Sequence, residues 1–185
     1  MSDIKELRDH VNGGNETKDF SMAGVVLQPA YCCSGYDGDT IDVVSKYMGS
    51  YYRFTLRMMG YDSPEKRTKR KDLETKEEIK TRKLWANHSK EHLLWFVENN
   101  YNLKVVCIKE DKYGRVLANI FITLPSGKEF NVNNEMVDNG YCVPYGVNGD
   151  LHKKKWDYSS FVYTKPGLKS GLHKVDNVIS YLDSN

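Results

Sequence analysis

The order of strand-like and helix-like segments is the feature that most constrains how this chain folds. A run without glycine or proline, 73–99, is dominated by strong helix formers and predicts one long helix. Segments rich in Val, Ile, Tyr and Thr lie on both sides of it and predict strands. These predicted strands are 20–27, 40–47, 51–59, 103–109, 115–123 and a short one after the turn at 125–127. A second helix is predicted at 131–139, where Gly140 ends it.

This order of elements predicts an α+β fold rich in β-structure. The expected architecture is a five-stranded Greek-key barrel of the OB type, with two or three helices packed on it. Other α+β folds fit the same order, and a fold does not by itself give the chemistry. Within the long helix, Leu84, His88, His92 and Trp95 or Phe96 fall on one helical stripe. Without an HExxH context, a packed or surface role is favoured over a metal role for the two histidines.

The length of the chain, 185 residues, suits one domain and is short for two. Residues 1–18 are predicted to form a mobile N-terminal leader. Residues 19–185 are predicted to form a single domain, whose last part, 150–185, has no clear pattern beyond short helices.

The charge and the cysteine content exclude few functions, but they indicate the cellular compartment. The net charge is only +2, so basic residues matter only where they cluster, at 66–71 and 153–155. The chain shows no secretory signal and no membrane-spanning run. Its four cysteines lack the paired spacing of a zinc site or a disulfide framework. We therefore expect reduced thiols, an intracellular location and no membrane partner, with secretion left open for a mature form.

Two acidic segments carry candidate chemistry. The sequence of residues 37–40 is DGDT, and residues 62–65 are DSPE, five positions after Arg57. Either segment alone is most simply a turn. If the barrel brings Asp39 beside Asp62 and Glu65, however, the three carboxylates repel one another, and a hard cation with oxygen ligands would relieve that repulsion.

A third segment makes the combination specific. Residues 111–115 are DKYGR, and the stretch 131–141 follows as a helix with a glycine stop. In this order the segments resemble the staphylococcal nuclease family over roughly residues 20–147. The hairpin between Thr40 and Arg57 is a few residues longer than in the bacterial prototype, and the basic cluster 66–71 follows the DSPE turn.

The resemblance implies a Ca²⁺-dependent nuclease that adds water to phosphorus and leaves 3′-phosphate products. Asp39, Asp62 and the backbone carbonyl of Ser63 would bind Ca²⁺, with Mg²⁺ and Mn²⁺ left open as alternatives. Glu65 would hold the attacking water as general base or as its orienter. Arg57 and Arg115 would clamp the scissile phosphate, because a guanidinium matches two phosphate oxygens.

The resemblance also implies contacts with the nucleotide. Tyr113 would stack on a base and Lys112 would touch a phosphate. Tyr145 would line the nucleotide pocket, and ordinary packing is an equally good interpretation of this residue. The expected partner is DNA, with single strands preferred and RNA left open, bound by a monomer. The alternative is a catalytically silent OB module that binds nucleic acid or protein. Because Asp39, Arg57, Asp62, Glu65 and Arg115 are all present, the enzyme is favoured.

Overall fold

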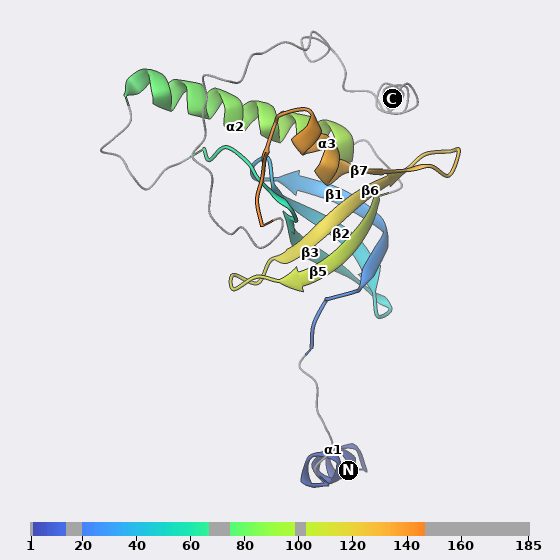
Figure 1. Cartoon of the computed structure of the whole chain (residues 1–185). Coiled ribbons are helices and arrows are strands. Elements are labelled where there is room, and N and C mark those ends of the chain that lie inside the picture. The colour runs from blue at the N-terminus through green and yellow to red at the C-terminus, as the bar shows by residue number, and fades with distance from the viewer. Residues whose placement is uncertain (1, 14–19, 67–74, 99–102, 147–185) are drawn as a thin grey trace.

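The computed structural model of the protein describes residues 2–13, 20–66, 75–98 and 103–146. Its centre is a five-stranded barrel, in which neighbouring strands follow the order β3, β2, β1, β5 and β6 (Figure 1). The strands are β1 Val26–Gly35, β2 Thr40–Tyr47, β3 Ser50–Met58, β5 Leu103–Glu110 and β6 Val116–Thr123. Neighbours pair antiparallel except β3 and β6, whose parallel pairing closes the sheet on itself. The predicted OB-type barrel is therefore confirmed.

Shorter elements complete the barrel. A strand β7, Glu129–Asn131, extends the sheet beyond β6, and the two-residue strands β4 (Tyr61–Asp62) and β8 (Val143–Pro144) pair with each other. Helix α3, Val132–Asp138, begins at an Asn131 N-cap and is followed by the C-cap Asn139, which confirms the predicted second helix. Its neighbour Gly140 has φ of 74°, a conformation that glycine adopts without a Cβ penalty.

The N-terminal part differs from expectation in two places. Helix α1 spans Ser2–Asn12, inside the predicted leader, where no helix was expected; residues 14–18 lie outside the described part. The predicted first strand at 20–27 was wrong, because β1 begins only at Val26 and runs to Gly35. The sequence pattern did not indicate this strand because Pro29 lies within it. It lies where the β1–β5 register shifts between Leu27 and Ala30, so its missing N–H interrupts a ladder that is already irregular.

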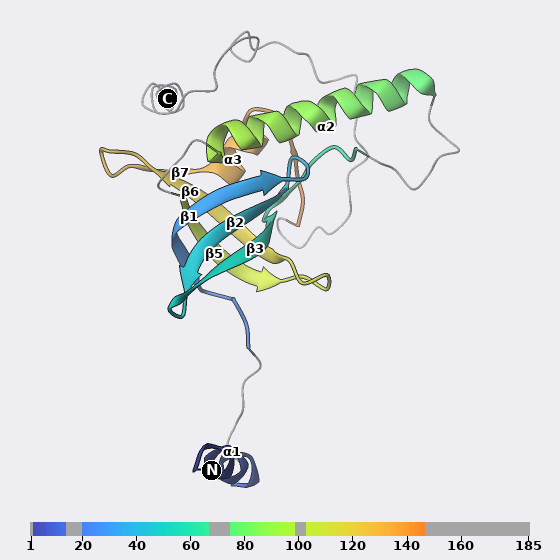
Figure 2. The same cartoon turned by 180° about the vertical axis from the view of Figure 1, so that it is seen from behind.

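Helix α2, Lys76–Val97, lies across one end of the barrel beside α3 (Figures 1 and 2). Thr75 and Glu78 form a capping box at its N-terminus, which satisfies two backbone N–H groups that would otherwise lack partners.

The buried face of α2 contains part of the predicted stripe. His92, Trp95 and Phe96 are buried, whereas Leu84 is 52% exposed. The buried face also includes Arg82 and Ser89. These two polar residues contact polar atoms of the site, so a pattern of apolar residues does not indicate them.

The core fills the barrel and the space beneath α2. The largest fully buried side chains are Tyr61, Phe96, Leu27, Ile41, Leu56, Met58, Leu93, Leu103, Ile120, Ile122 and Met136. His92 is buried among aromatic rings, with its centroid 3.8 Å from that of Tyr141, in agreement with the packed role favoured from sequence. All four cysteines are free. Among the described helices, none has the length and apolar character needed to cross a membrane.

Candidate active site

The first acidic segment forms the tight connection between β1 and β2. Asp39 lies at the start of β2 and is 5% exposed. Its carboxylate accepts hydrogen bonds from the Ser63 amide at 2.9 Å, the Ser63 hydroxyl at 2.8 Å and the Thr40 hydroxyl at 3.0 Å. Its backbone carbonyl accepts from the Met58 amide at 2.8 Å. Asp39 is therefore fixed to β3 and to the second acidic segment.

Gly38 lets this connection lie directly against α2. A Cβ at Gly38 would stand 1.9 Å from the hydroxyl oxygen of Ser89 and 2.9 Å from the Cβ of Ser63. The Gly38 carbonyl accepts from the Tyr61 hydroxyl at 3.1 Å and from the Cys142 thiol at 3.8 Å. The fit requires glycine because of close packing, not because of an unusual backbone angle.

Arg57 connects the two acidic segments. Its backbone position on β3 is opposite Thr40, the neighbour of Asp39. Its guanidinium forms an ion pair with Asp39 and, through Nη2, a 2.8 Å ion pair with Oδ1 of Asp62. The side chains of Arg57, Asp39 and Asp62 are only 13%, 8% and 4% exposed. One cation thus neutralises half of the charge of two buried carboxylates.

The second acidic segment is held in place by β4. After the turn at Gly60, β4 pairs with β8 through Tyr61↔Pro144 and Asp62↔Val143. This pairing buries Asp62 and Ser63, each 3% exposed. Tyr145, one of the predicted nucleotide-binding residues, is half-buried and donates its backbone N–H to the Gly60 carbonyl at 2.9 Å, so its described contact supports this turn.

Glu65 follows directly and lies differently from the aspartates. Its side chain is exposed, and its backbone carbonyl accepts a 2.7 Å hydrogen bond from Nη1 of Arg82 on α2. Arg82 is itself buried, 4% exposed. The helix therefore fixes the main chain at Glu65, whose side chain is exposed.

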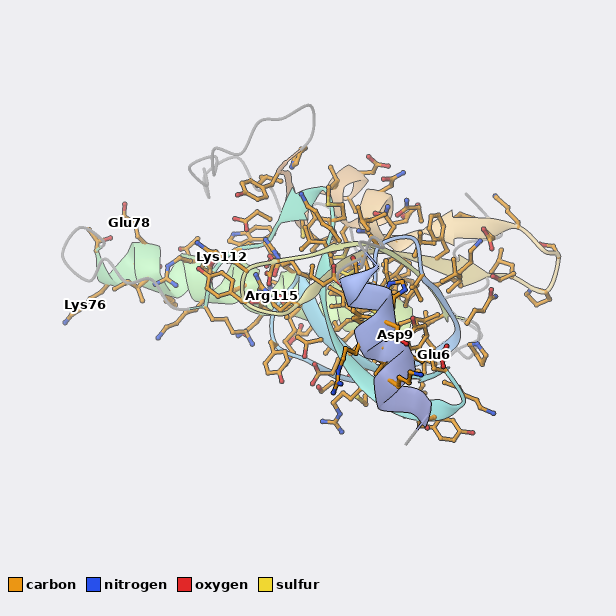
Figure 3. All side chains as sticks on the ribbon, turned by 90° about the horizontal axis from the view of Figure 1, so that it is seen from below. Glu6, Asp9, Lys76, Glu78, Lys112 and Arg115 are labelled. Carbon is orange, nitrogen blue, oxygen red and sulfur yellow. The ribbon has the colours of Figure 1, made fainter. Side chains whose placement is uncertain are left out.

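The DKYGR segment forms the β5–β6 turn. Oδ1 of Asp111 accepts from the backbone amides of Tyr113 at 2.8 Å and Arg115 at 3.0 Å, and Oδ2 accepts from the Arg115 guanidinium at 2.7 Å. Partial burial alone would raise the pKa of Asp111, but these hydrogen bonds outweigh it and hold that pKa below its ordinary value. The ring of Tyr113 is 72% exposed, and the Lys112 ammonium lies 5.1 Å from its centroid. Figure 3 shows Lys112 and Arg115 on this turn.

The barrel closure brings this turn to the Arg57 face. Arg57 pairs with Leu117 across the parallel β3–β6 ladder, and Arg115 precedes Leu117 by two residues. The β5–β6 turn, which ends with Arg115, therefore leads directly into the part of β6 that pairs with Arg57. The described side-chain contacts of Arg115, however, lie within its own turn: the ion pair to Asp111 and the ring of Tyr113, 5.6 Å away.

Comparison with known families decides the relationship. The sequence profile described as "Staphylococcal nuclease homologue" matches residues 55–163, more than half of the chain. The chain belongs to this family. The match contains Arg57, the second acidic segment and the DKYGR turn, while the DGDT segment precedes it. A search of curated proteins returned no match.

Ca²⁺ is the cofactor expected from the resemblance to the staphylococcal nuclease family, and the donor groups of this site can be compared with what such a cation requires. Among the described residues, no three His, Cys, Asp or Glu side chains lie close enough together to hold a metal ion. The three expected carboxylates therefore do not form one cluster. Two of them, the buried aspartates, are bridged by Arg57, and Glu65 lies outside this pair. The donor chemistry still fits a hard cation. Two buried carboxylates against one guanidinium leave a negative charge, and all donors are oxygens.

Three residues of this site escaped prediction from sequence: Tyr61, Ser89 and Cys142 hold the Gly38 connection from β4, α2 and the segment before β8. Ser89 and Cys142 also contact each other, with oxygen and sulfur 3.4 Å apart. No motif marks these three residues, since a lone Tyr, Ser or Cys outside a motif is most simply a packing residue. Burial raises the pKa of the Cys142 thiol, so it stays protonated beside the acids.

Proposed function

We propose that this protein is a Ca²⁺-dependent nuclease that hydrolyses phosphodiester bonds of single-stranded DNA and of RNA. The observation that carries the proposal is the buried cluster in which Arg57 bridges Asp39 and Asp62. Burying two carboxylates costs several kcal/mol per ion before compensation, so their retention favours a functional role over a solvated turn. Membership of the staphylococcal nuclease family supports the same class of chemistry.

In this proposal, Asp39, Asp62 and the Ser63 carbonyl would hold the ion, which would polarise the phosphate and lower the pKa of a bound water. Glu65 takes the proton of the attacking water, and its exposed carboxylate can reach a substrate that lies over the buried acids. The water oxygen bonds to phosphorus as the bond to the 5′-oxygen breaks, and the departing 5′-oxygen takes up a proton from solvent water. The products are a 3′-phosphate and a 5′-hydroxyl.

Arg57 and Arg115 act on the phosphate. Arg115 lies directly before the part of β6 that pairs with Arg57, and a guanidinium donates to two phosphate oxygens at once. Because negative charge increases on those oxygens in the transition state, the donors contribute most at that point. Asp111 orients Arg115, while Tyr113 offers an exposed ring for a base and Lys112 a charge for a neighbouring phosphate.

A second function, nucleic-acid binding without catalysis, is favoured by one observation: Glu65 stands apart from the bridged aspartates. Digestion separates the two. Labelled single-stranded DNA and RNA are incubated with the full chain in Ca²⁺ or in chelator, beside Glu65→Gln and the matched surface control Glu129→Gln. The nuclease proposal expects cleavage in Ca²⁺ only, 3′-phosphate ends, and a rate loss on the order of 10²-fold in Glu65→Gln alone. Binding without cleavage would favour the second function.

A further inference from the structure

The outer face of β1, β2 and β3 continues directly from the candidate active site. Side chains on this face alternate along each strand with those that fill the barrel, where Ile41 and Val43 are fully buried. Arg57 stands at one end of the outer row on β3, followed by Thr55, Arg53 and Tyr51. In Figure 2 these three strands are turned toward the viewer, and α2 and α3 lie over the end of the barrel and not over this face.

The strand register shows which side chains stand together. Val44 on β2 is flanked by Tyr31 of β1 on one side and Arg53 of β3 on the other. One step further from the active site, Lys46 stands opposite Tyr51. Paired strands are about 5 Å apart, so the rings and the cations alternate at spacings of a few ångströms to about 10 Å. Four of these five side chains are exposed, Tyr31 by 57% and Tyr51 by 78%.

The acid on this face is covered. Asp42 is the single Asp or Glu of β1, β2 and β3, and it is 3% exposed. Its carboxylate accepts from the Thr55 hydroxyl at 2.7 Å, the Ser34 hydroxyl at 3.1 Å and the Tyr36 hydroxyl at 3.2 Å. The surface of the face therefore presents cations and rings, while its negative charge lies beneath three hydroxyl donors.

Tyr36 connects this covered acid to the surface. Its ring is 58% exposed, while its hydroxyl is tied to Asp42. The hydrogen bond to Asp42 raises the pKa of Tyr36, and the positive charge of Arg53 opposes that shift, which agrees with a place for this ring near Arg53.

We propose that this outer face is a binding track for single-stranded nucleic acid leading away from the scissile phosphate at Arg57, in which Tyr31, Tyr36 and Tyr51 stack on bases and Arg53 and Lys46 hold phosphates. The inference rests on the nuclease function proposed above and extends it to substrate length. A single strand is the occupant that fits, because interleaved rings stack only on bases that are not paired. From Arg57 to Tyr51 the strand rises by roughly 20 Å, which a dinucleotide held at Arg57 does not span.

Binding in chelator tests the track without cleavage. The probe is a fluorescent single strand of about twelve nucleotides, within the range one OB barrel covers. Tyr51→Ala should weaken binding about tenfold, as the loss of one stacked base does. Arg53→Ala should reduce the slope of log K against log salt by about 0.7, the contribution of one phosphate contact on a single strand. The control is Tyr52→Ala, since Tyr52 leaves the other side of β3 and its ring lies 6.3 Å from that of Phe54.

A second measurement separates this inference from the proposed function: cleavage of a dinucleotide in Ca²⁺, which the track variants should leave unchanged. Wild-type binding of the long probe by Tyr51→Ala and Arg53→Ala, in a protein that cleaves, would overturn the track alone. An equal loss in Tyr52→Ala, or an equal Tyr51→Ala effect on duplex DNA, would overturn it too. If the variants bind as expected but no substrate is cleaved, the track stands and the nuclease function fails.

Discussion

Nη2 of Arg57 lies 2.8 Å from Oδ1 of Asp62, and the same guanidinium contacts the carboxylate of Asp39. The pairing joins β3, the end of β4 and the connection that leads into β2. It therefore serves the fold and the proposed chemistry together, and substitutions at Arg57 should affect both.

Removal of the Arg57 guanidinium, which bridges the two buried aspartates, should destabilise the protein. Arg57→Ala leaves two buried carboxylates without a partner, and breaking a buried pair in this way costs about 3–5 kcal/mol. We expect a fall of that size in the free energy of unfolding, measured by urea denaturation. The double variant Arg57→Ala/Asp62→Asn should recover part of the loss. A change below about 0.5 kcal/mol, the level of ordinary surface substitutions, would show that the bridge is not formed.

Close packing at Gly38 predicts a steric effect with a specific rescue. In Gly38→Ala the new methyl group would meet the Ser89 side chain, whose oxygen is 1.9 Å from the Cβ position. Overpacking of this kind costs about 1–3 kcal/mol and should displace Asp39, so stability and cleavage should both fall. Adding Ser89→Gly removes the nearest obstacle and should restore part of each. If Gly38→Ala behaves as the wild type in thermal unfolding and digestion, the connection does not lie against α2.

The ion pair on the β5–β6 turn predicts a positioning role for Asp111. In Asp111→Ala, Arg115 loses the carboxylate that holds its guanidinium, and misplacement of a phosphate-binding group can cost up to about 10²-fold in rate. We expect kcat/KM to fall while KM for the dinucleotide changes less. The same change in an Arg115→Ala background should have little further effect, since the two residues act as a unit. Fully additive losses would contradict this role.

The buried thiol of Cys32 should make the free energy of unfolding depend on pH in the alkaline range. Burial raises the pKa of its thiol from 9.0 to about 12. Between these values the unfolded chain releases a proton that the folded protein retains, so the free energy of unfolding should decrease as pH rises from about 9. Cys32→Ala should flatten that decrease in urea denaturation at a series of pH values. Cys33→Ala, at the exposed neighbour, should keep the wild-type slope. The reverse pattern would place Cys33 inside and Cys32 outside.

The barrel was predictable because its signals are local. Alternating apolar residues, glycine turns and a long run of helix formers each depend on neighbours in sequence, and they indicated most strands and both packed helices. The extent of β1 and the polar part of the buried face of α2 were not found, because Pro29 lies at a register shift and Arg82 and Ser89 bury polar groups against the site. The extent of β1 and the burial of polar residues on α2 depend on contacts between residues far apart in the sequence, which local patterns do not contain.

The candidate site divides in the same way. The motifs predicted that Asp39, Asp62 and Glu65 gather together with Arg57 and Arg115. The structure places Asp39, Arg57, Asp62 and Ser63 in contact, without Glu65 in that cluster. The exposed position of Glu65, the pairing of Arg115 with Asp111 and the backbone role of Tyr145 follow from hydrogen bonds that no motif specifies. Which of these groups act in catalysis remains a prediction for the experiments above.

Binding of Ca²⁺ by the two buried aspartates is tested by the initial rate of single-strand cleavage as a function of free Ca²⁺, in the wild type, in Asp39→Asn and Asp62→Asn, and in the control Asp138→Asn. We expect saturation with Ca²⁺ in the wild type and the control, and a strongly raised Ca²⁺ requirement or no cleavage in the two site variants. Cleavage that is independent of Ca²⁺, or identical Ca²⁺ curves for all four proteins, would contradict this binding.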